Sequence, residues 1–508
     1  MENLLQVAPS QIAYSDPIKA PLSSSKIVSI RPTSGNSVGS SSTSASSTDS
    51  ITFKLPSNGM LKTGSMYLKY NVGINTSAGS TGGKAVVGAV LGDEFSPDSA
   101  VFSRMKVFSS DGTEISHQSN YGAYCSVMNR LKKARGELES RGSILNGSGL
   151  GYGESLDEST TKVNEFAYSH LALNGNAQDA NALNIGVPPG LARNYRILSQ
   201  QSGLAGGGGA VDSRVTSCVH QIQGGLLDHN ESVYLPTFAL GAGLTLEMGM
   251  ADVKDAVKVV CANAVDAQGG TNICHTDATA KYFLTDIELI AELTFYDNSV
   301  LSSVNNLLCQ GIKIRHPRVK SQVNSISSQE STIQMSEHGR SINAVICGLR
   351  NTTQNHTLQN FSNDFQYKVD GTNFPVSYQA QCGSEVIPSS AVKVGSQSAF
   401  ELERAVSGGD SKFRLGNCIN ASSYFKTAVQ AGAGANELVS GDCLFGVSFM
   451  SHGDKPALMS GKTSSAGSIP LSFALNMNST PSNCELMSFV ISDQITELLH
   501  DGSVVISR

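Results

Sequence analysis

Residues 281–308 read KYFLTDIELIAELTFYDNSVLSSVNNLL and contain two hydrophobic periods in direct succession. Over 286–295 apolar and polar side chains alternate, with Ile290 as the one exception. A period of two places alternate side chains on opposite faces of a strand. This segment is therefore predicted to be a strand with one buried face and one solvated face.

The second period begins after Asp297. Apolar residues over 300–308 recur at helical spacing, with Asp297 in the position of an N-cap and Gly311 in that of a C-terminal stop. The pattern predicts a short amphipathic helix. Because this helix lies a little past the middle of 508 residues, we interpret it as the junction between two β-rich halves.

The composition favours an all-β protein. Glycine (50 residues) far outnumbers proline (15), only 15% of residues are charged, and tryptophan is absent. Such a composition is typical of many strands joined by long polar loops. A chain of 508 residues commonly contains about three domains, but two large β-sandwiches of about 200–250 residues each fit the length as well. The formal charge of −6 gives no overall attraction to phosphate backbones, which disfavours sequence-specific nucleic-acid binding.

The cysteines and the N-terminus indicate a cytosolic origin. The ten cysteines are widely spaced without a Cys-x-x-Cys pair, which predicts free thiols in a reducing compartment. Residues 1–20 carry Glu2, Asp16 and two prolines where a signal peptide needs basic residues and an apolar run. No apolar segment approaches the ~20 residues of a membrane span. We expect a soluble chain made in the cytosol.

Three segments follow from the order of these patterns. Residues 1–50 are expected to be an N-terminal arm and a Ser/Gly-rich loop, 51–310 a first sandwich and 311–508 a second one. A glycine- and asparagine-rich excursion at about 136–214 interrupts the first sandwich. Loops of this length are uncommon and usually functional, and we interpret this one as outward-facing.

Alternation and turn residues place about eight strands in each half, without a β-α-β rhythm. In the first half the Asp111-Gly112 dipeptide predicts a hairpin, and residues 120–134 predict a surface helix whose C-terminal cations complement the helix dipole rather than bind phosphate. In the second half we expect a helix over 398–406 and, after a strand at 486–491, a short helix from 492 to 499. The whole pattern predicts two antiparallel sandwiches. The expected strands are at 27–30, 51–56, 66–72, 102–108, 215–222, 233–236, 243–248 and 286–295, then 312–315, 319–326, 341–349, 374–380, 444–450, 471–477, 486–491 and 504–506.

No motif for catalysis, cofactors or metals withstands inspection. Gly461-Lys462-Thr463 matches the end of a phosphate-binding loop, but Pro456 stands where the first glycine of that motif belongs. The ten histidines are scattered singly and never paired at i, i+4, so we interpret them as polar surface residues. We therefore expect no catalytic residue, no cofactor, no metal ligand and no substrate.

Two groups of charged residues allow two interpretations each. Asp286, Glu288 and Glu292 share one face of the central strand and would suit a cation, although a solvated face alone produces the same pattern and is favoured. A basic cluster follows the predicted helix, and we favour a strand edge protected by charge over contact with an acidic neighbour or an anionic membrane surface. This cluster consists of Lys313, Arg315, His316, Arg318 and Lys320.

Short motifs recur in a fixed order along nearly the whole chain. They are IRP (30–32), ITFKLP (51–56), FSRMKVF (102–108), DG (111–112), NY (120–121), YLP (234–236), GLTLEM (243–248), IELIAEL (287–293), SIPLSF (468–473), FVISD (489–493) and DGSV (501–504). In this order they resemble the double jelly-roll major capsid proteins of small icosahedral double-stranded DNA viruses. The likeness is closest to those of Polinton-like viruses and virophages.

The resemblance implies two tandem eight-stranded antiparallel jelly rolls with short helices and long loops. It implies a structural protein of the virion, synthesised in the host cytosol, whose trimers are pseudo-hexameric capsomers that tile an icosahedral shell around a double-stranded DNA genome. The implied partners are further copies of the chain, penton and minor capsid proteins, and an internal membrane that the arm would contact. The implied sandwich cores contain Ile287, Leu289, Leu293 and Phe295 in the first half and Val345, Phe473 and Phe489 in the second.

Two other classes remain open on the sequence. A receptor- or glycan-binding sandwich of the spike or lectin type would normally expose aromatic platforms, yet aromatic residues make up only 6% of the chain. A β-sandwich hydrolase would need a triad or a carboxylate pair, and none is evident.

Overall fold

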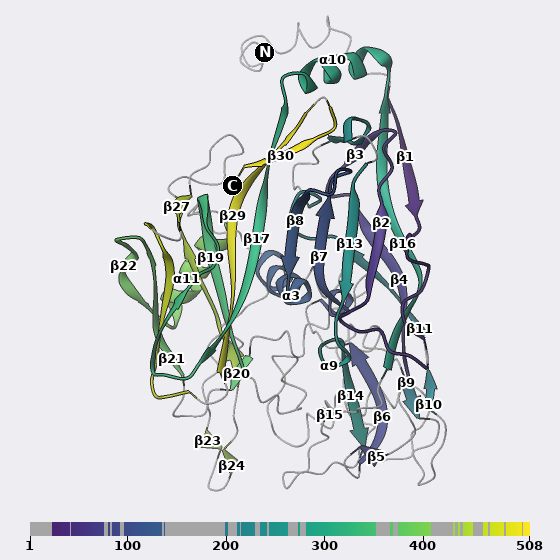
Figure 1. Cartoon of the computed structure of the whole chain (residues 1–508). Helices are drawn as coiled ribbons and strands as arrows, with labels where there is room; N and C mark the ends of the chain where they lie inside the picture. Colours follow the sequence, from purple (N-terminus) through teal and green to yellow (C-terminus); the bar gives the residue numbers. More distant parts are fainter. Residues whose placement is uncertain are drawn as a thin grey trace, which may run out of the picture.

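The computed structural model (Figure 1) describes both halves of the chain with several gaps. The described residues are 23–40, 42–75, 80–81, 84–91, 96–134, 137, 199–201, 211–213, 215–228, 234–240, 243–262, 273–274, 281–351, 366–368, 374–407, 430–431, 435–436, 440–450, 461–465, 468–481, 484–499 and 501–507. Most of the expected arm and most of the 136–214 excursion lie outside these residues. None of the helices described is long and apolar enough to cross a membrane.

The first half contains a sandwich of two antiparallel sheets, called here the first sandwich. One sheet has the order β11 (Val215–Gln221), β4 (Tyr67–Asn75), β16 (Lys281–Tyr296), β3 (Met60–Lys62) and β12 (Tyr234–Pro236). A sixth strand, β1 (Ser23–Ile30), also pairs with β16. The other has the order β2 (Ser50–Lys54), β13 (Thr245–Met250), β7 (Phe102–Phe108) and β8 (Glu114–Ser119). A further sheet is built from β10 (Val211–Ser213), β9 (Ser199–Gln201), β6 (Lys84–Leu91), β14 (Val257–Ala262) and β15 (Ile273–Cys274), with β5 (Ser80–Thr81) beside β6.

The second half contains the second sandwich. Its first sheet has the order β17 (Ile312–Ile326), β29 (Cys484–Leu498), β19 (Gly339–Asn351) and β26 (Leu444–Ser448), with β27 (Lys462–Ser464) and β30 (Val504–Ser507) attached. Its second sheet has the order β18 (Glu330–Gln334), β28 (Leu471–Met477), β21 (Pro375–Cys382) and β22 (Glu385–Lys393). Two small ribbons complete it, β20 (Gln366–Lys368) with β25 (Ser440–Asp442) and β23 (Gln430–Ala431) with β24 (Ala435–Asn436).

The two sandwiches repeat one topology. In chain order, β1, β2, β4, β7, β8, β11, β13 and β16 take the places that β17, β18, β19, β21, β22, β26, β28 and β29 take in the second sandwich. The fifth strand of each set is followed by a helix, α3 (Tyr121–Lys132) or α11 (Ser396–Val406). Residues 23–30 therefore already belong to the first sandwich, within the segment expected to be arm and loop.

The junction has the predicted form. β16 alternates buried and exposed side chains and leads into α10 (Asn298–Leu308), which ends before Gly311 at a φ of +81°. A positive φ favours glycine, so this residue suits the turn into β17. The Asp111-Gly112 hairpin between β7 and β8 is also confirmed, with Gly112 at a φ of +85°. Shorter elements are α9 (Val253–Ala256), η1 (Pro97–Ser99) and η3 (Thr237–Leu240).

The apolar core consists of two clusters of unequal extent. Ile287, Leu289 and Leu293 are fully buried in the first cluster, as expected, and Phe295 packs at its margin. Val345 and Phe473 lie in the second cluster, inside the second sandwich. Phe489 was expected there too and is instead part of the first cluster, which extends from one sandwich across to the other.

Three expectations about single elements are wrong. Residues 492–498 continue strand β29 rather than forming the expected helix. The strand was missed because Ser492, Asp493 and Gln494 are polar but buried, so the sequence shows no alternation of polar and apolar residues there. The two strands expected on either side of Pro317 form one strand, β17, paired with β29 along its whole length. The helix α3 is not a surface helix, since every residue from Tyr121 to Leu131 is buried.

Candidate functional site

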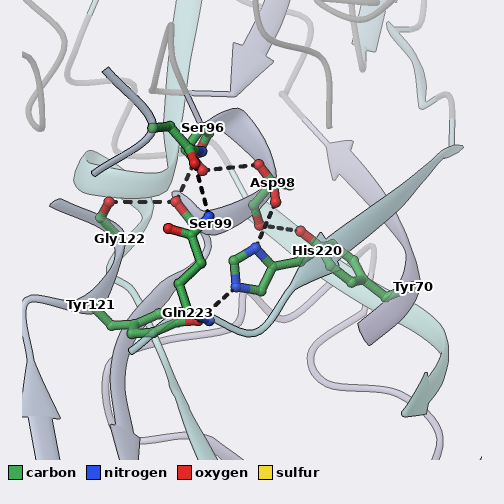
Figure 2. Close-up of polar contacts among 9 residues, drawn as sticks. Tyr70, Ser96, Asp98, Ser99, Tyr121, Gly122, His220 and Gln223 are labelled. Carbon is green, nitrogen blue, oxygen red and sulfur yellow. Dashed lines mark hydrogen bonds and ion pairs between the residues drawn. The ribbon is translucent and has the colours of Figure 1, made fainter. Parts of the chain in front are cut away.

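A buried network of polar side chains surrounds His220 on β11 (Figure 2). Its Nδ1 lies 2.5 Å from Oδ2 of Asp98 in η1, and its Nε2 lies 2.9 Å from the hydroxyl of Tyr121, the first residue of α3. All three side chains are buried, His220 and Tyr121 completely. Three elements far apart in the sequence therefore meet at one imidazole.

Further hydrogen bonds surround these groups. The Ser96 hydroxyl donates to Oδ1 of Asp98 at 3.1 Å, and the Tyr70 hydroxyl donates to the Asp98 carbonyl. The backbone N–H of Gln223 donates to the Tyr121 hydroxyl at 2.9 Å. Burial raises the pKa of both tyrosines well above its usual value, so both remain hydroxyl donors.

This geometry accounts for the proton on His220. When the Tyr121 hydroxyl donates a hydrogen bond to Nε2, the ring proton is on Nδ1, and Nδ1–H donates a hydrogen bond to the Asp98 carboxylate. The arrangement has the groups of a general base, but the ring and both partners are sealed from solvent. The network therefore ties η1, β11 and the start of α3 together.

Helix α3 extends from this network into the contact between the sandwiches. The ring of Tyr124 on α3 packs against that of Phe489 on β29, with centroids 5.9 Å apart and planes inclined at 61°. Both residues belong to the cluster that spans the two halves. One continuous apolar core therefore sets how the sandwiches lie against each other, and α3 is its central element (Figure 1).

Polar contacts fix the register of the same interface. On the first sandwich, Ser119 at the end of β8 and Asn120 beside it both bond to Ser321 on β17, with the two serine hydroxyls 2.8 Å apart and Asn120 Nδ2 at 3.0 Å. The Ser321 hydroxyl also donates to the Ser119 carbonyl at 2.9 Å. Nearby, Gln494 Nε2 on β29 donates to the Ile115 carbonyl on β8 at 2.5 Å. These bonds allow only one alignment of β8 against β17 and β29, because each depends on a particular pair of residues.

The basic cluster on β17 is largely neutralised within the chain. Arg315 bonds to the buried Asp493 at 2.9 Å, and Arg318 lies 2.5 Å from the buried Glu337. His316 is buried and lies 2.8 Å from the Thr496 hydroxyl. β17 is an edge strand, as the favoured interpretation predicted, but the arginines serve internal ion pairs rather than only guarding that edge.

The acidic residues of β16 do not converge on one point. Asp286, at a φ of +50°, accepts a bond from Asn71 Nδ2 at 2.9 Å, and Glu292 pairs with Lys62 at 3.1 Å. No set of three or more His, Cys, Asp or Glu side chains suited to a metal occurs within the described ranges.

The phosphate-loop-like motif, the histidines and the cysteines can also be placed in the structure. Gly461-Lys462-Thr463 leads into strand β27 rather than a helix, and Lys462 pairs with Glu385 at 2.9 Å. The expectation of surface histidines is wrong for His220 and His316, which are buried. Seven cysteines have described side chains and all seven are free thiols: Cys125, Cys218, Cys309, Cys347, Cys382, Cys443 and Cys484.

The sequence did not single out the network around His220. Asp98, Tyr121 and His220 are common residue types separated by long intervals, and no motif joins them. A signal was present only in the neighbouring Asn120-Tyr121 pair, which belongs to the ordered motifs.

The comparisons with known proteins identify the fold through structure alone. No protein-family model and no curated protein sequence matches the chain. The chain superimposes on a chain of the Sputnik virophage particle with a TM-score of 0.55 and 11% identity, covering 97% of this chain and 89% of that one. The fold is a double jelly roll. The first and second sandwiches are its two jelly rolls, as the repeated strand order requires.

Two further structures show the same double jelly roll. The mavirus major capsid protein matches with a TM-score of 0.52 and 11% identity, over 98% of this chain and 94% of that one. The Faustovirus major capsid protein matches with a TM-score of 0.51 and 9% identity, over 96% and 92%. The likeness spans both jelly rolls in each case rather than one sandwich.

Proposed function

We propose that this chain is a viral major capsid protein that self-assembles into trimeric, pseudo-hexameric capsomers of an icosahedral shell. The observation that carries the proposal is the double jelly roll over the whole chain, with both sandwiches locked together by one shared core. The structures it resembles include two named as major capsid proteins. Near-complete coverage in both directions supports a whole-protein likeness rather than a shared module.

The internal architecture suits a building block. Three copies with two similar sandwiches each place six sandwiches around one three-fold axis, so the trimer fits a six-coordinated position in a shell. That arrangement requires a fixed angle between the sandwiches of one chain. The Tyr124–Phe489 packing and the Ser119–Ser321 bonds supply such a constraint.

A structural role is also consistent with the sealed polar network. The His220 site and the ion pairs of β17 are buried and internally satisfied, which suits stability rather than turnover. In this proposal the chain has no substrate, binds no specific nucleic-acid sequence, and is found in the virion after synthesis in the host cytosol.

The finer partners are part of the same proposal. Residues 1–22 precede β1 and would contact neighbouring capsomers, minor capsid proteins or an internal membrane. The excursion at about 136–214 would cover the outside of the shell or interlock adjacent subunits. Penton proteins would fill the five-fold positions. Removing residues 1–22 leaves β1 intact, so shells that form normally from the shortened chain would disprove the role of the arm.

Light scattering and negative-stain microscopy of the purified chain test the proposal together. Obligate interfaces commonly bury more than ~2,000 Å², so trimers that persist at nanomolar concentration are expected. The predicted mass is three times that of the 53.3 kDa chain, with a hexagonal outline in projection. Monomers without that outline would refute the proposal and direct attention to glycan binding.

A further inference from the structure

One surface that is covered in the first jelly roll has an exposed counterpart in the second jelly roll. β8 is the edge strand of its sheet, and only one of its six residues, His117, is exposed because β17 and β29 of the second jelly roll cover it. β22 holds the same place in its own sheet, yet six of its nine residues are exposed. Nothing in the described part of the chain takes the covering role for β22.

The helices that follow these strands differ in the same way. Eleven of the twelve residues of α3 are buried, whereas four of the eleven residues of α11 are. Phe400 on α11 and Val386 on β22 are 39% and 40% exposed. The second jelly roll therefore presents an incompletely covered edge with apolar side chains.

The strand that β8 contacts, β17, also has an exposed counterpart in the other jelly roll. β17 receives β8, and only three of its fifteen residues are exposed. β1 takes the place of β17 in the first jelly roll, pairs with β16 as β17 pairs with β29, and has six of eight residues exposed. Ile27 on β1, at 72%, is the most exposed large apolar residue described.

Both strands carry a serine that pairs with an apolar residue of the neighbouring strand. Ser321, which bonds to Ser119, pairs with Phe489 on the neighbouring strand. Ser29 on β1 pairs in the same way with Ile290 on β16, beside the half-exposed Tyr67 of β4. β1 thus offers a hydroxyl with apolar neighbours, as β17 does at Ser321.

From this correspondence we infer that β22 and α11 of one copy bind β1 and the adjoining face of β16 of the next copy, reproducing between chains the contact that β8 and α3 make with β17 and β29 within the chain. This rests on the proposed self-assembly and assigns its surfaces. β22 and β1 lie at opposite margins of the molecule (Figure 1). A contact between two different surfaces of this kind is head-to-tail, and three copies close it into a ring of six jelly rolls.

Charge substitutions at the two surfaces test this assignment. Ile27→Asp disables the β1 surface and Val386→Asp the β22 surface, and Ser29→Arg is a second variant on β1. All three side chains are exposed, so folding should be preserved, which circular dichroism and the unfolding midpoint check. Leu307→Asp on α10 is the matched control, since Leu307 is 55% exposed and lies outside both surfaces.

The masses expected from light scattering are distinct. Wild type and Leu307→Asp should have three times the mass of the 53.3 kDa chain, and each surface variant should have the mass of one chain. An equimolar mixture of Ile27→Asp and Val386→Asp retains one intact contact and should form two-chain species but no ring. A contact between identical surfaces would not be restored by such mixing.

Different failures have different meanings. A wild-type trimer that every surface variant still forms would overturn the assigned surfaces and leave the capsid proposal standing. A Leu307→Asp chain that dissociates as readily as the others would also overturn the assignment. A wild-type monomer would contradict the capsid proposal, and this inference with it.

Discussion

Tyr124 and Phe489, from opposite halves of the chain, pack ring against ring at a centroid distance of 5.9 Å. The pair joins α3, the helix that follows β8 in the first jelly roll, to β29 of the second, inside a core that both share. This contact therefore helps to fix the orientation of the two jelly rolls relative to each other.

Phe489→Ala should therefore destabilise the chain strongly. Phe489 is fully buried, and truncating such a residue typically costs about 3–5 kcal/mol. A double-mutant cycle with Tyr124→Ala should give a coupling of about 0.5–1.5 kcal/mol for the aromatic pair, measured by urea unfolding. Phe374→Ala is the control, since Phe374 is 38% exposed and should lose far less. Additive effects at 124 and 489 would contradict the contact.

Asp493→Ala should be as costly as a core truncation. Asp493 accepts bonds from Arg315 at 2.9 Å, Ser341 at 2.6 Å and Asn343 at 2.8 Å while almost fully buried. Removing one partner of a buried ion pair commonly costs about 3–5 kcal/mol because the other charge is left uncompensated. The exposed pair of Lys462 is the comparison, and Lys462→Ala should cost less than about 1 kcal/mol. Equal losses in thermal unfolding would show that burial of Asp493 is unimportant.

His220→Leu should loosen the start of α3. The substitution leaves the buried Asp98 carboxylate and the Tyr121 hydroxyl without their shared partner, at a cost of at least about 1–3 kcal/mol. Hydrogen exchange should accelerate first in α3, which the network anchors. His117→Leu, at a half-exposed position on β8, is the matched control and should leave exchange in α3 unchanged. Uniform acceleration over both jelly rolls would argue against an anchoring role.

Stability should fall at alkaline pH. Burial, with a smaller effect from Asp98, raises the pKa of Cys218 from 9.0 to about 12. Between these values the unfolded chain has lost the thiol proton that the folded chain retains, so stability is full below pH about 9 and declines as pH rises toward about 12. One such proton corresponds to about 1.4 kcal/mol per pH unit. Cys218→Ala should make the decline in urea-unfolding free energy shallower, and an unchanged slope would exclude this thiol as a cause.

The local elements were largely predictable because their signals are short-range. The alternation over 286–295, the helical spacing before Gly311 and the Asp111-Gly112 turn each depend on neighbours within a few residues, and all three hold. The order of the motifs then resembled the double jelly roll that the structure shows.

The contacts between halves were beyond the reach of such patterns. α3 has the mixed composition of a surface helix, and its burial depends on the second jelly roll, distant in sequence, as well as on the first. Polar residues such as Asp493 and Gln494 occupy buried places because Arg315 and the Ile115 carbonyl satisfy them. In this segment the pattern of polar and apolar residues does not follow the pattern of burial. The end of β29 was therefore mistaken for a helix.

An electron cryomicroscopy map of the assembled wild-type chain would show directly how its copies are arranged. We expect six jelly rolls around a three-fold axis, with β22 of each copy against β1 of the next. A map with the two jelly rolls of each chain splayed apart, or with copies joined through other surfaces, would contradict this arrangement.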